Sequence, residues 1–133
     1  MNSYFSVNDA NKILPAVIKK FNHAKKAKAE VMKIEHQLTA GITPTTSLEE
    51  YTIIKRKLNS SITKFYQSIE DLESTGASLK GLDEGLLDFP AKRFDEEIWL
   101  CWKEGETEIK FWHEKDTGFM GRKPISVSNE SLV

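Results

Sequence analysis

Residues 97–112 decide the fold of this chain, and they read EIWLCWKEGETEIKFW. Two runs rich in aromatic and β-branched residues, 97–102 and 107–112, flank Glu104-Gly105, which has the composition of a tight turn. We therefore predict a C-terminal β-hairpin with a two-residue turn. In this register Leu100 faces Ile109, and Ile98 faces Phe111.

Side chains of the predicted hairpin alternate between its two faces. One face is expected to join the core and carries Ile98, Leu100, Trp102, Ile109 and Phe111. The other carries Trp99, Cys101, Glu108, Lys110 and Trp112. Because Trp99 and Trp112 together would form an apolar patch that a monomer normally covers, they are the candidate interaction face. A second subunit, a partner, a ligand or another segment of the same chain would cover it.

Two amphipathic helices are predicted before the hairpin. Apolar residues recur at three- and four-residue steps over residues 6–38 and again over residues 48–72. Ser6 or Asn8 can cap the first helix, and Ser47 can cap the second. Pro15 either kinks the first helix or marks its restart. Since the connection between the helices is short, they should pack as an antiparallel hairpin.

The expected fold class is therefore α+β, with a long antiparallel helical hairpin carrying a small antiparallel β-sheet. Short segments at 77–80 and 86–89 read as small strands or extended turns. Residues 1–125 are expected to form a single domain, and residues 126–133 have the composition of a disordered C-terminal tail. A chain of 133 residues with 39% hydrophobic content can bury one core without disulfides.

Composition and charge narrow the classes of function. The single cysteine, Cys101, excludes an internal disulfide and a multi-cysteine zinc site. With no signal peptide and no apolar run of membrane length, a cytoplasmic protein that does not enter a membrane is expected. Residues 1–40 hold seven lysines against three acids, but these lysines fall between apolar helix positions, as a solvated face does. Nucleic-acid binding is therefore not favoured.

Polar residues that could carry chemistry gather near the end of the hairpin. His113 follows the second run, and an imidazole beside carboxylates is typical of a metal site or an acid/base pair. Asp88, Glu96, Glu106 and Glu114 are the carboxylates near enough, and His113 with Glu106 is the candidate metal-ligand pair. A hydrogen-bonded structural histidine is the alternative.

Arg122 and Cys101 have less specific surroundings. Arg122 would either clamp an anion or pair with Asp88 to hold its loop in place. Cys101 is not favoured as a nucleophile, because no helix terminus is predicted near it and Glu108 would raise its pKa. The sequence contains no phosphate-binding loop, dinucleotide fingerprint or nucleophile-elbow motif.

Three motifs carry a resemblance to a known family: FSVNDAN with ILP near the start, GLLDFP in the middle, and LCWxxGE through WH to GFxGR near the end. Over residues 5–125 the chain resembles the bacterial and archaeal family called domain of unknown function 2203. The resemblance implies a small cytoplasmic protein of unassigned reaction. It also points to Asp88, Glu106, His113 and Arg122 as the polar positions of the motif.

The leading hypothesis is a non-enzymatic binding or assembly module, expected to be a homodimer or to bind a protein partner. It would use the Trp99 and Trp112 face or the helices. The alternative is a metal- or anion-binding protein that uses His113 and nearby carboxylates, with a divalent metal ion as the candidate cofactor. Whether the protein is an enzyme stays open at this point.

Overall fold

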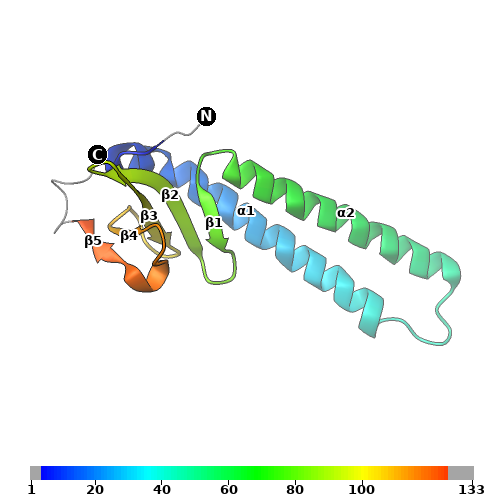
Figure 1. Cartoon of the computed structure of the whole chain (residues 1–133). Helices are drawn as coiled ribbons and strands as arrows, with labels where there is room; N and C mark the ends of the chain where they lie inside the picture. The colour runs from blue at the N-terminus through cyan, green and yellow to red at the C-terminus, as the bar shows by residue number, and fades with distance from the viewer. Residues whose placement is uncertain (1–3, 126–133) are drawn as a thin grey trace.

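The computed structural model describes residues 4–125, which form two long helices followed by a five-stranded antiparallel sheet (Figure 1). The class is therefore α+β, as the sequence predicts. The helices are α1 (Val7–Ala40) and α2 (Leu48–Glu73). The strands are β1 (Ser78–Gly81), β2 (Leu86–Arg93), β3 (Glu96–Lys103), β4 (Phe111–Glu114) and β5 (Lys123–Pro124), with a short 3-10 helix, η1 (Phe119–Gly121), before β5. The predicted tail, 126–133, lies outside the described residues.

Both helices begin at serine caps that the sequence identifies. The Ser6 hydroxyl accepts a hydrogen bond from the backbone N–H of Asp9 at 3.0 Å, and the Ser47 hydroxyl accepts one from Glu50 at 3.0 Å. Each serine thereby satisfies one of the free N–H groups in the first turn of its helix. Helix α1 continues through Pro15, so the alternative of a helix restart at this proline is wrong.

The predicted C-terminal hairpin is part of a larger sheet. Its strands follow the order β1-β2-β3-β4-β5, so each strand pairs with its neighbour in the sequence. The tightest connection is the two-residue turn Phe94-Asp95 between β2 and β3, where Arg93 pairs with Glu96. Phe94 has a φ of 56°, a conformation that non-glycine residues rarely adopt. No glycine marks this turn, which is why the sequence did not reveal it.

Glu104-Gly105 does form a turn, in which the backbone N–H of Glu106 donates to the Lys103 carbonyl oxygen at 3.0 Å, but this turn does not join β3 directly to β4 as predicted. Residues 104–110 form a longer loop, and β4 begins only at Phe111. Leu100 pairs with Trp112 rather than with Ile109, a difference of three positions (112 − 109). The backbone N–H of Ile109 takes no part in strand pairing and instead donates to Asn11 Oδ1 on α1 at 2.6 Å. An odd shift turns every side chain of a strand to the opposite face, so the predicted faces of β4 are exchanged.

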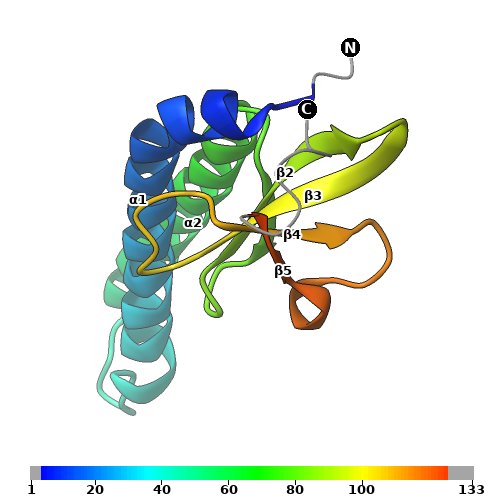
Figure 2. The same ribbon diagram turned by 90° about the vertical axis from the view of Figure 1, so that its left-hand side faces the viewer.

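One face of the sheet packs against the helices, and Figure 2 shows both helices on this side. The buried residues of this core include Leu14, Val17 and Phe21 from α1, Leu72 from α2, and Leu87, Phe89, Leu100, Trp102 and Trp112 from the sheet. The ring of Phe21 meets that of Trp102 edge-on, with centroids 5.3 Å apart. Such contacts fix the position of the sheet on α1.

The predicted interaction face of Trp99 and Trp112 does not form. Trp112 lies on the core side of the sheet and is 2% exposed, whereas Trp99 lies on the other side and is partly exposed. The exchanged faces of β4 are the reason. Trp112 is therefore covered within the chain, and Trp99 alone remains available at the surface.

The helices extend well beyond the sheet, and the loop that joins them lies at the far end of the molecule (Figure 1). Between Tyr4 and Ile125, no helix combines the length and the apolar character needed to cross a membrane.

Candidate functional site

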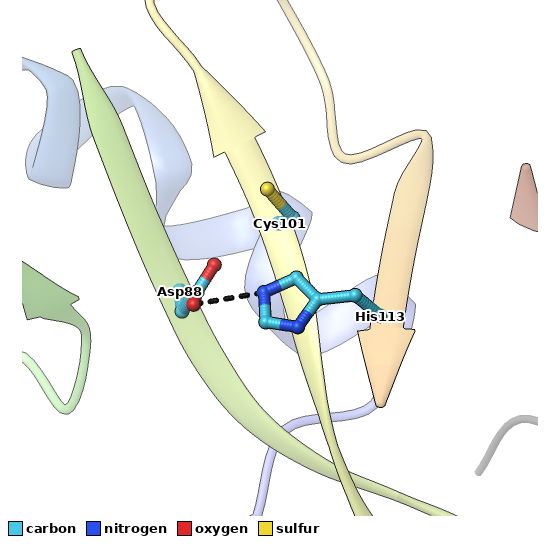
Figure 3. Close-up of side chains that lie close together, drawn as sticks. All are labelled: Asp88, Cys101 and His113. Atoms are coloured by element: carbon cyan, nitrogen blue, oxygen red, sulfur yellow. Dashed lines mark hydrogen bonds and ion pairs between the residues drawn. The ribbon is translucent and has the colours of Figure 1, made fainter. Parts of the chain in front are cut away.

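Three neighbouring strands place polar side chains on the face of the sheet that is turned away from the helices. Asp88 of β2 lies directly opposite Cys101 of β3, and His113 of β4 lies opposite Trp99, two residues along β3 from Cys101. Because alternate residues of these strands enter the core, the remaining side chains share the outer face. Figure 3 shows Asp88 and His113 reaching toward each other across β3, with Cys101 beside them.

These three side chains form a compact cluster with one donor atom each. The Nε2 atom of His113 lies 2.9 Å from Asp88 Oδ2, and the three donor atoms all lie within 4.8 Å of one another. Asp88 is 3% exposed, Cys101 1% and His113 2%. The cluster is therefore withdrawn from water although it lies on the outer face of the sheet.

The hydrogen bonds of His113 fix how its ring is protonated. Its Nδ1 atom lies 2.8 Å from the backbone carbonyl oxygen of Glu114, which can only accept, so Nδ1 carries a proton. The Nε2 atom is thus directed at Asp88 Oδ2, and one proton lies between the two atoms. Either Nε2 donates it to the carboxylate, or the protonated carboxyl group donates it to the lone pair of Nε2. This orientation, with one ring nitrogen held by a carbonyl, is the usual one for a histidine that binds a metal through its other nitrogen.

Asp88 is the least satisfied member of the cluster. Its burial raises the pKa of the carboxyl group above the ordinary value, and the neighbouring His113 and Lys80 offset this in part. Within the described part of the chain, its Oδ1 atom is buried and has no hydrogen-bond partner. A buried oxygen without a partner costs free energy; the neighbouring Cys101 thiol is a weak donor that offsets this only in part, and a cation would satisfy the oxygen more fully.

Cys101 is held as a neutral thiol. Burial, and after it the charge of Asp88, raises the pKa of this thiol from 9.0 to about 12. At neutral pH the thiolate is therefore almost absent, and Cys101 is no nucleophile by itself. A metal ion displaces the proton from a coordinating thiol, so the same group remains competent as a ligand.

A cavity of about 180 Å³ gives access to the cluster. Its walls include all three donor residues together with Leu86, Trp99, Gly118 and Phe119, and two lysines, Lys80 and Lys115, complete the lining. Lys115 pairs with Glu97 at 2.7 Å, whereas Lys80 places its ammonium group over the ring of Trp99 at 4.3 Å. The cavity thus combines apolar walls with positive charge.

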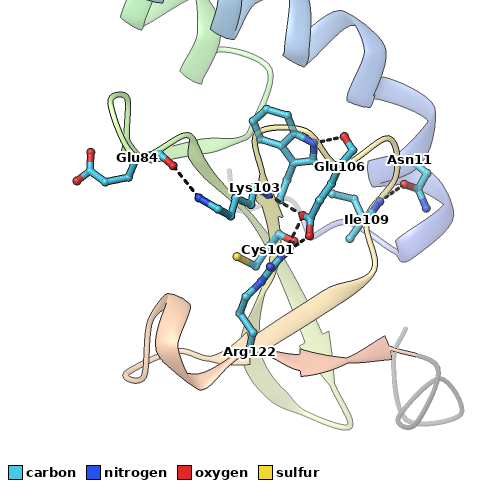
Figure 4. Close-up of polar contacts among 8 residues, drawn as sticks. Asn11, Glu84, Cys101, Lys103, Glu106, Ile109 and Arg122 are labelled. Carbon is cyan, nitrogen blue, oxygen red and sulfur yellow. Dashed lines mark hydrogen bonds and ion pairs between the residues drawn. The ribbon is translucent and has the colours of Figure 1, made fainter.

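Glu106 and Arg122 belong to a second network, drawn in Figure 4. Arg122 Nη2 lies 2.8 Å and 2.9 Å from the two carboxylate oxygens of Glu106, and it also reaches the Cys101 carbonyl oxygen at 3.3 Å. The guanidinium group lies over the rings of Phe111 and Phe119, at 4.0 Å and 4.8 Å. With these contacts, Arg122 links the 104–110 loop and η1 to β3.

The structure thus brings the predicted polar residues together in two pairs rather than in one site. Asp88 meets His113, and Glu106 meets Arg122, so the structural partner of Arg122 is Glu106 and not Asp88. Glu106 is not part of the cluster that contains His113. Sequence reasoning missed Cys101 as a member, because the hairpin register placed it near Glu108 instead of Asp88. The available signal was Asp88 itself, a lone carboxylate between apolar residues in LLDFP.

A larger hollow lies elsewhere and has a different character. It is an open groove of about 820 Å³ between α1 and α2, whose lining includes four lysines, at positions 26, 33, 57 and 64. The two buried serines there, Ser61 and Ser68, donate to carbonyl oxygens of their own helix, at 2.8 Å and 2.6 Å. Since these buried hydroxyl groups already have hydrogen-bond partners, the groove does not direct several reactive or metal-binding groups at one point, as the cluster does.

Comparison with known proteins identifies the family but no activity. No curated protein and no solved structure matches the chain. The family described as "Uncharacterized conserved protein (DUF2203)" matches residues 3–125, which include both helices, the whole sheet and the cluster. On this match, the chain belongs to the DUF2203 family of uncharacterised conserved proteins.

Proposed function

We propose that this protein binds one transition metal ion of the zinc class through Asp88, Cys101 and His113. The observation that carries the proposal is the convergence of a carboxylate, a thiol and an imidazole nitrogen, all buried, within 4.8 Å of one another. Sulfur, nitrogen and oxygen donors are the usual ligands of zinc in proteins.

Two further features of the cluster support a cation at this place. The Glu114 carbonyl leaves Nε2 of His113 as the atom that faces the other donors. The buried Oδ1 atom of Asp88 has no partner within residues 4–125, and a cation would satisfy it. Donor atoms on one tetrahedral zinc ion lie roughly 3.5 Å apart, so the widest pair must close by about 1 Å on binding.

The number of protein ligands indicates what kind of metal site this is. Structural zinc sites are closed by four protein ligands, whereas catalytic sites have three and keep a position open. Here three residues converge, and the cavity of about 180 Å³ lies beside them. The proposed metal would therefore have one position open to a small molecule, at which it could act as a Lewis acid.

Calorimetric titration of protein without a histidine tag tests the proposal. We expect one Zn²⁺ ion per chain, and a loss of affinity of more than about 100-fold in Asp88→Asn, Cys101→Ala and His113→Gln, because each removes a direct ligand. His36→Gln is the matched control, since this histidine is exposed on α1 and should leave binding unchanged. Circular dichroism of each variant shows whether it is folded.

Binding of Co²⁺ provides a second measurement that a structural role would not produce. Coordination by the Cys101 thiolate should give an intense near-ultraviolet charge-transfer band that is absent in Cys101→Ala. Binding should also release about two protons per ion at neutral pH, one from the neutral thiol and one from the hydrogen bond between His113 Nε2 and Asp88. If neither ion binds to the folded parent protein, the cluster is a structural hydrogen-bonded network and the proposal is refuted.

Self-association through the helices is a second candidate function. Near the connection between α1 and α2, four large apolar side chains are exposed: Met32 (60%), Leu48 (80%), Tyr51 (37%) and Ile53 (47%). They lie in the C-terminal part of α1 and the first turns of α2, and these ends of the helices extend beyond the sheet (Figure 1), where a second copy of the chain would cover them. Sedimentation at micromolar concentration should give about twice the chain mass of 15.2 kDa. Leu48→Glu with Ile53→Glu should give monomers, and a monomeric parent protein would refute this candidate.

A further inference from the structure

The charges around the proposed metal site determine which ligand fits its open position. A divalent ion bound by the Cys101 thiolate, the Asp88 carboxylate and the neutral His113 ring gives a centre with a net charge of zero. Added negative charge at the open position then needs a cation beside the cavity. The chain provides one in Lys80.

Lys80 is suited to this role because, among the described residues, no carboxylate forms an ion pair with it. Both lysines line the cavity, but Lys115 is paired with Glu97 at 2.7 Å. Among residues 4–125, Lys80 makes no ion pair, and its ammonium group lies 4.3 Å from the centre of the Trp99 ring.

The walls of the cavity limit the size and the polarity of the ligand. At about 180 Å³, the cavity is smaller than the pockets of roughly 300–1,000 Å³ that enclose drug-sized molecules. Leu86, Trp99 and Phe119 give it apolar surface near the donor atoms. One negative charge with a short apolar tail is therefore the best match for its shape and charge.

We propose, on the basis of the metal site above, that the open position of the metal binds a small monocarboxylate whose charge is balanced by Lys80. One carboxylate oxygen takes the open position, the Lys80 ammonium group lies near the other, and a short tail contacts Trp99 and Phe119. Arg122 takes no part, since it does not line the cavity and its Nη2 group is held by Glu106 at 2.8 Å and 2.9 Å.

The experiment measures metal binding and anion binding separately. The affinity for Co²⁺ is determined first, and the Co²⁺-loaded protein is then titrated with butanoate while its visible spectrum is recorded. We expect a saturable spectral change with butanoate and none with butanamide, which has the same shape without the charge. In Lys80→Met the Kd for butanoate should rise about tenfold or more, with the affinity for Co²⁺ unchanged.

Lys103→Met is the matched control. Lys103 also places its ammonium group over an aromatic ring, that of Phe119 at 5.5 Å, but it does not line the cavity. This variant should bind butanoate as the parent protein does. An equal loss in both lysine variants would overturn the assignment to Lys80.

The remaining outcomes separate the two proposals. If Co²⁺ binds but butanoate leaves the spectrum unchanged, the metal site stands and the carboxylate inference is wrong. If inorganic phosphate binds more tightly than butanoate, the preference for a single negative charge is wrong. If the folded protein does not bind Co²⁺, the metal site itself is refuted, and the carboxylate site falls with it.

Discussion

The Cys101 thiol should make the protein less stable in mild alkali. Burial and the charge of Asp88 raise the pKa of this thiol from 9.0 to about 12 in the folded protein. Between these values the unfolded chain releases the thiol proton, whereas the folded chain retains it. Because the unfolded state then binds fewer protons, the free energy of unfolding falls as the pH rises.

The size of the effect follows from the two pKa values. Each pH unit above the unfolded value costs about 1.4 kcal/mol, so the loss near pH 10.5 is about 2 kcal/mol, and it is negligible near pH 7.5. Cys101→Ala removes this pH dependence of the free energy of unfolding. It also leaves a small cavity, which costs about 1 kcal/mol at every pH. The parent protein should therefore be the more stable of the two near neutrality and the less stable near pH 10.5.

Urea unfolding of both proteins with a reductant present, followed by tryptophan fluorescence, measures this crossing. Lysine and tyrosine titrations affect both proteins alike, so they cancel in the difference between the two free energies of unfolding. A difference that stays constant to within about 0.5 kcal/mol from near pH 7.5 to near pH 10.5 would refute the reasoning. It would mean that the thiol ionises as easily in the folded protein as in the unfolded chain.

Three further experiments test the register, the second polar network and the strained turn. Trp112→Ala should cost about 3 to 5 kcal/mol because the ring is buried in the core, whereas Trp99→Ala should cost about 1 kcal/mol; equal losses in urea unfolding would contradict the register. Arg122→Met should cost about 1 to 3 kcal/mol, and a double-mutant cycle with Glu106→Gln should give a coupling of about 1 kcal/mol, which strictly additive losses would exclude. Phe94→Asn should stabilise the protein by about 1 kcal/mol, since asparagine tolerates a φ of 56°; a lower melting temperature would show that contacts of the ring outweigh the strain.

The helices were predictable because their signals are local. Serine caps and apolar residues at helical spacing lie within a few residues of one another, and Ser6, Ser47, Leu14 and Phe21 all take the expected places. The register of β4 was not predictable in this way, because it depends on contacts between residues far apart in the sequence. The hydrogen bond from Ile109 to Asn11 on α1, for example, holds the end of the 104–110 loop on the helix, outside the pairing of β3 with β4.

The sequence predicted single residues of the candidate site but not how they are grouped in space. Asp88 and His113 stand out by their chemistry, since one lies among apolar residues and the other ends an aromatic run. That they meet, and that Cys101 joins them, follows from the pairing of β2 with β3 and of β3 with β4. An error of three positions in the pairing of β3 with β4 was enough to place Cys101 opposite Glu108 and to hide that it lies beside His113.

The helical extension beyond the sheet has a practical consequence for experiments. The 41–47 loop lies at the opposite end of the molecule from β4 and β5, which adjoin the cluster (Figure 1). An affinity tag or a fluorescent label inserted in this loop would be far from the cavity and from every candidate donor atom. The protein can therefore be immobilised or labelled through the loop while both chain ends and the sheet stay as they are.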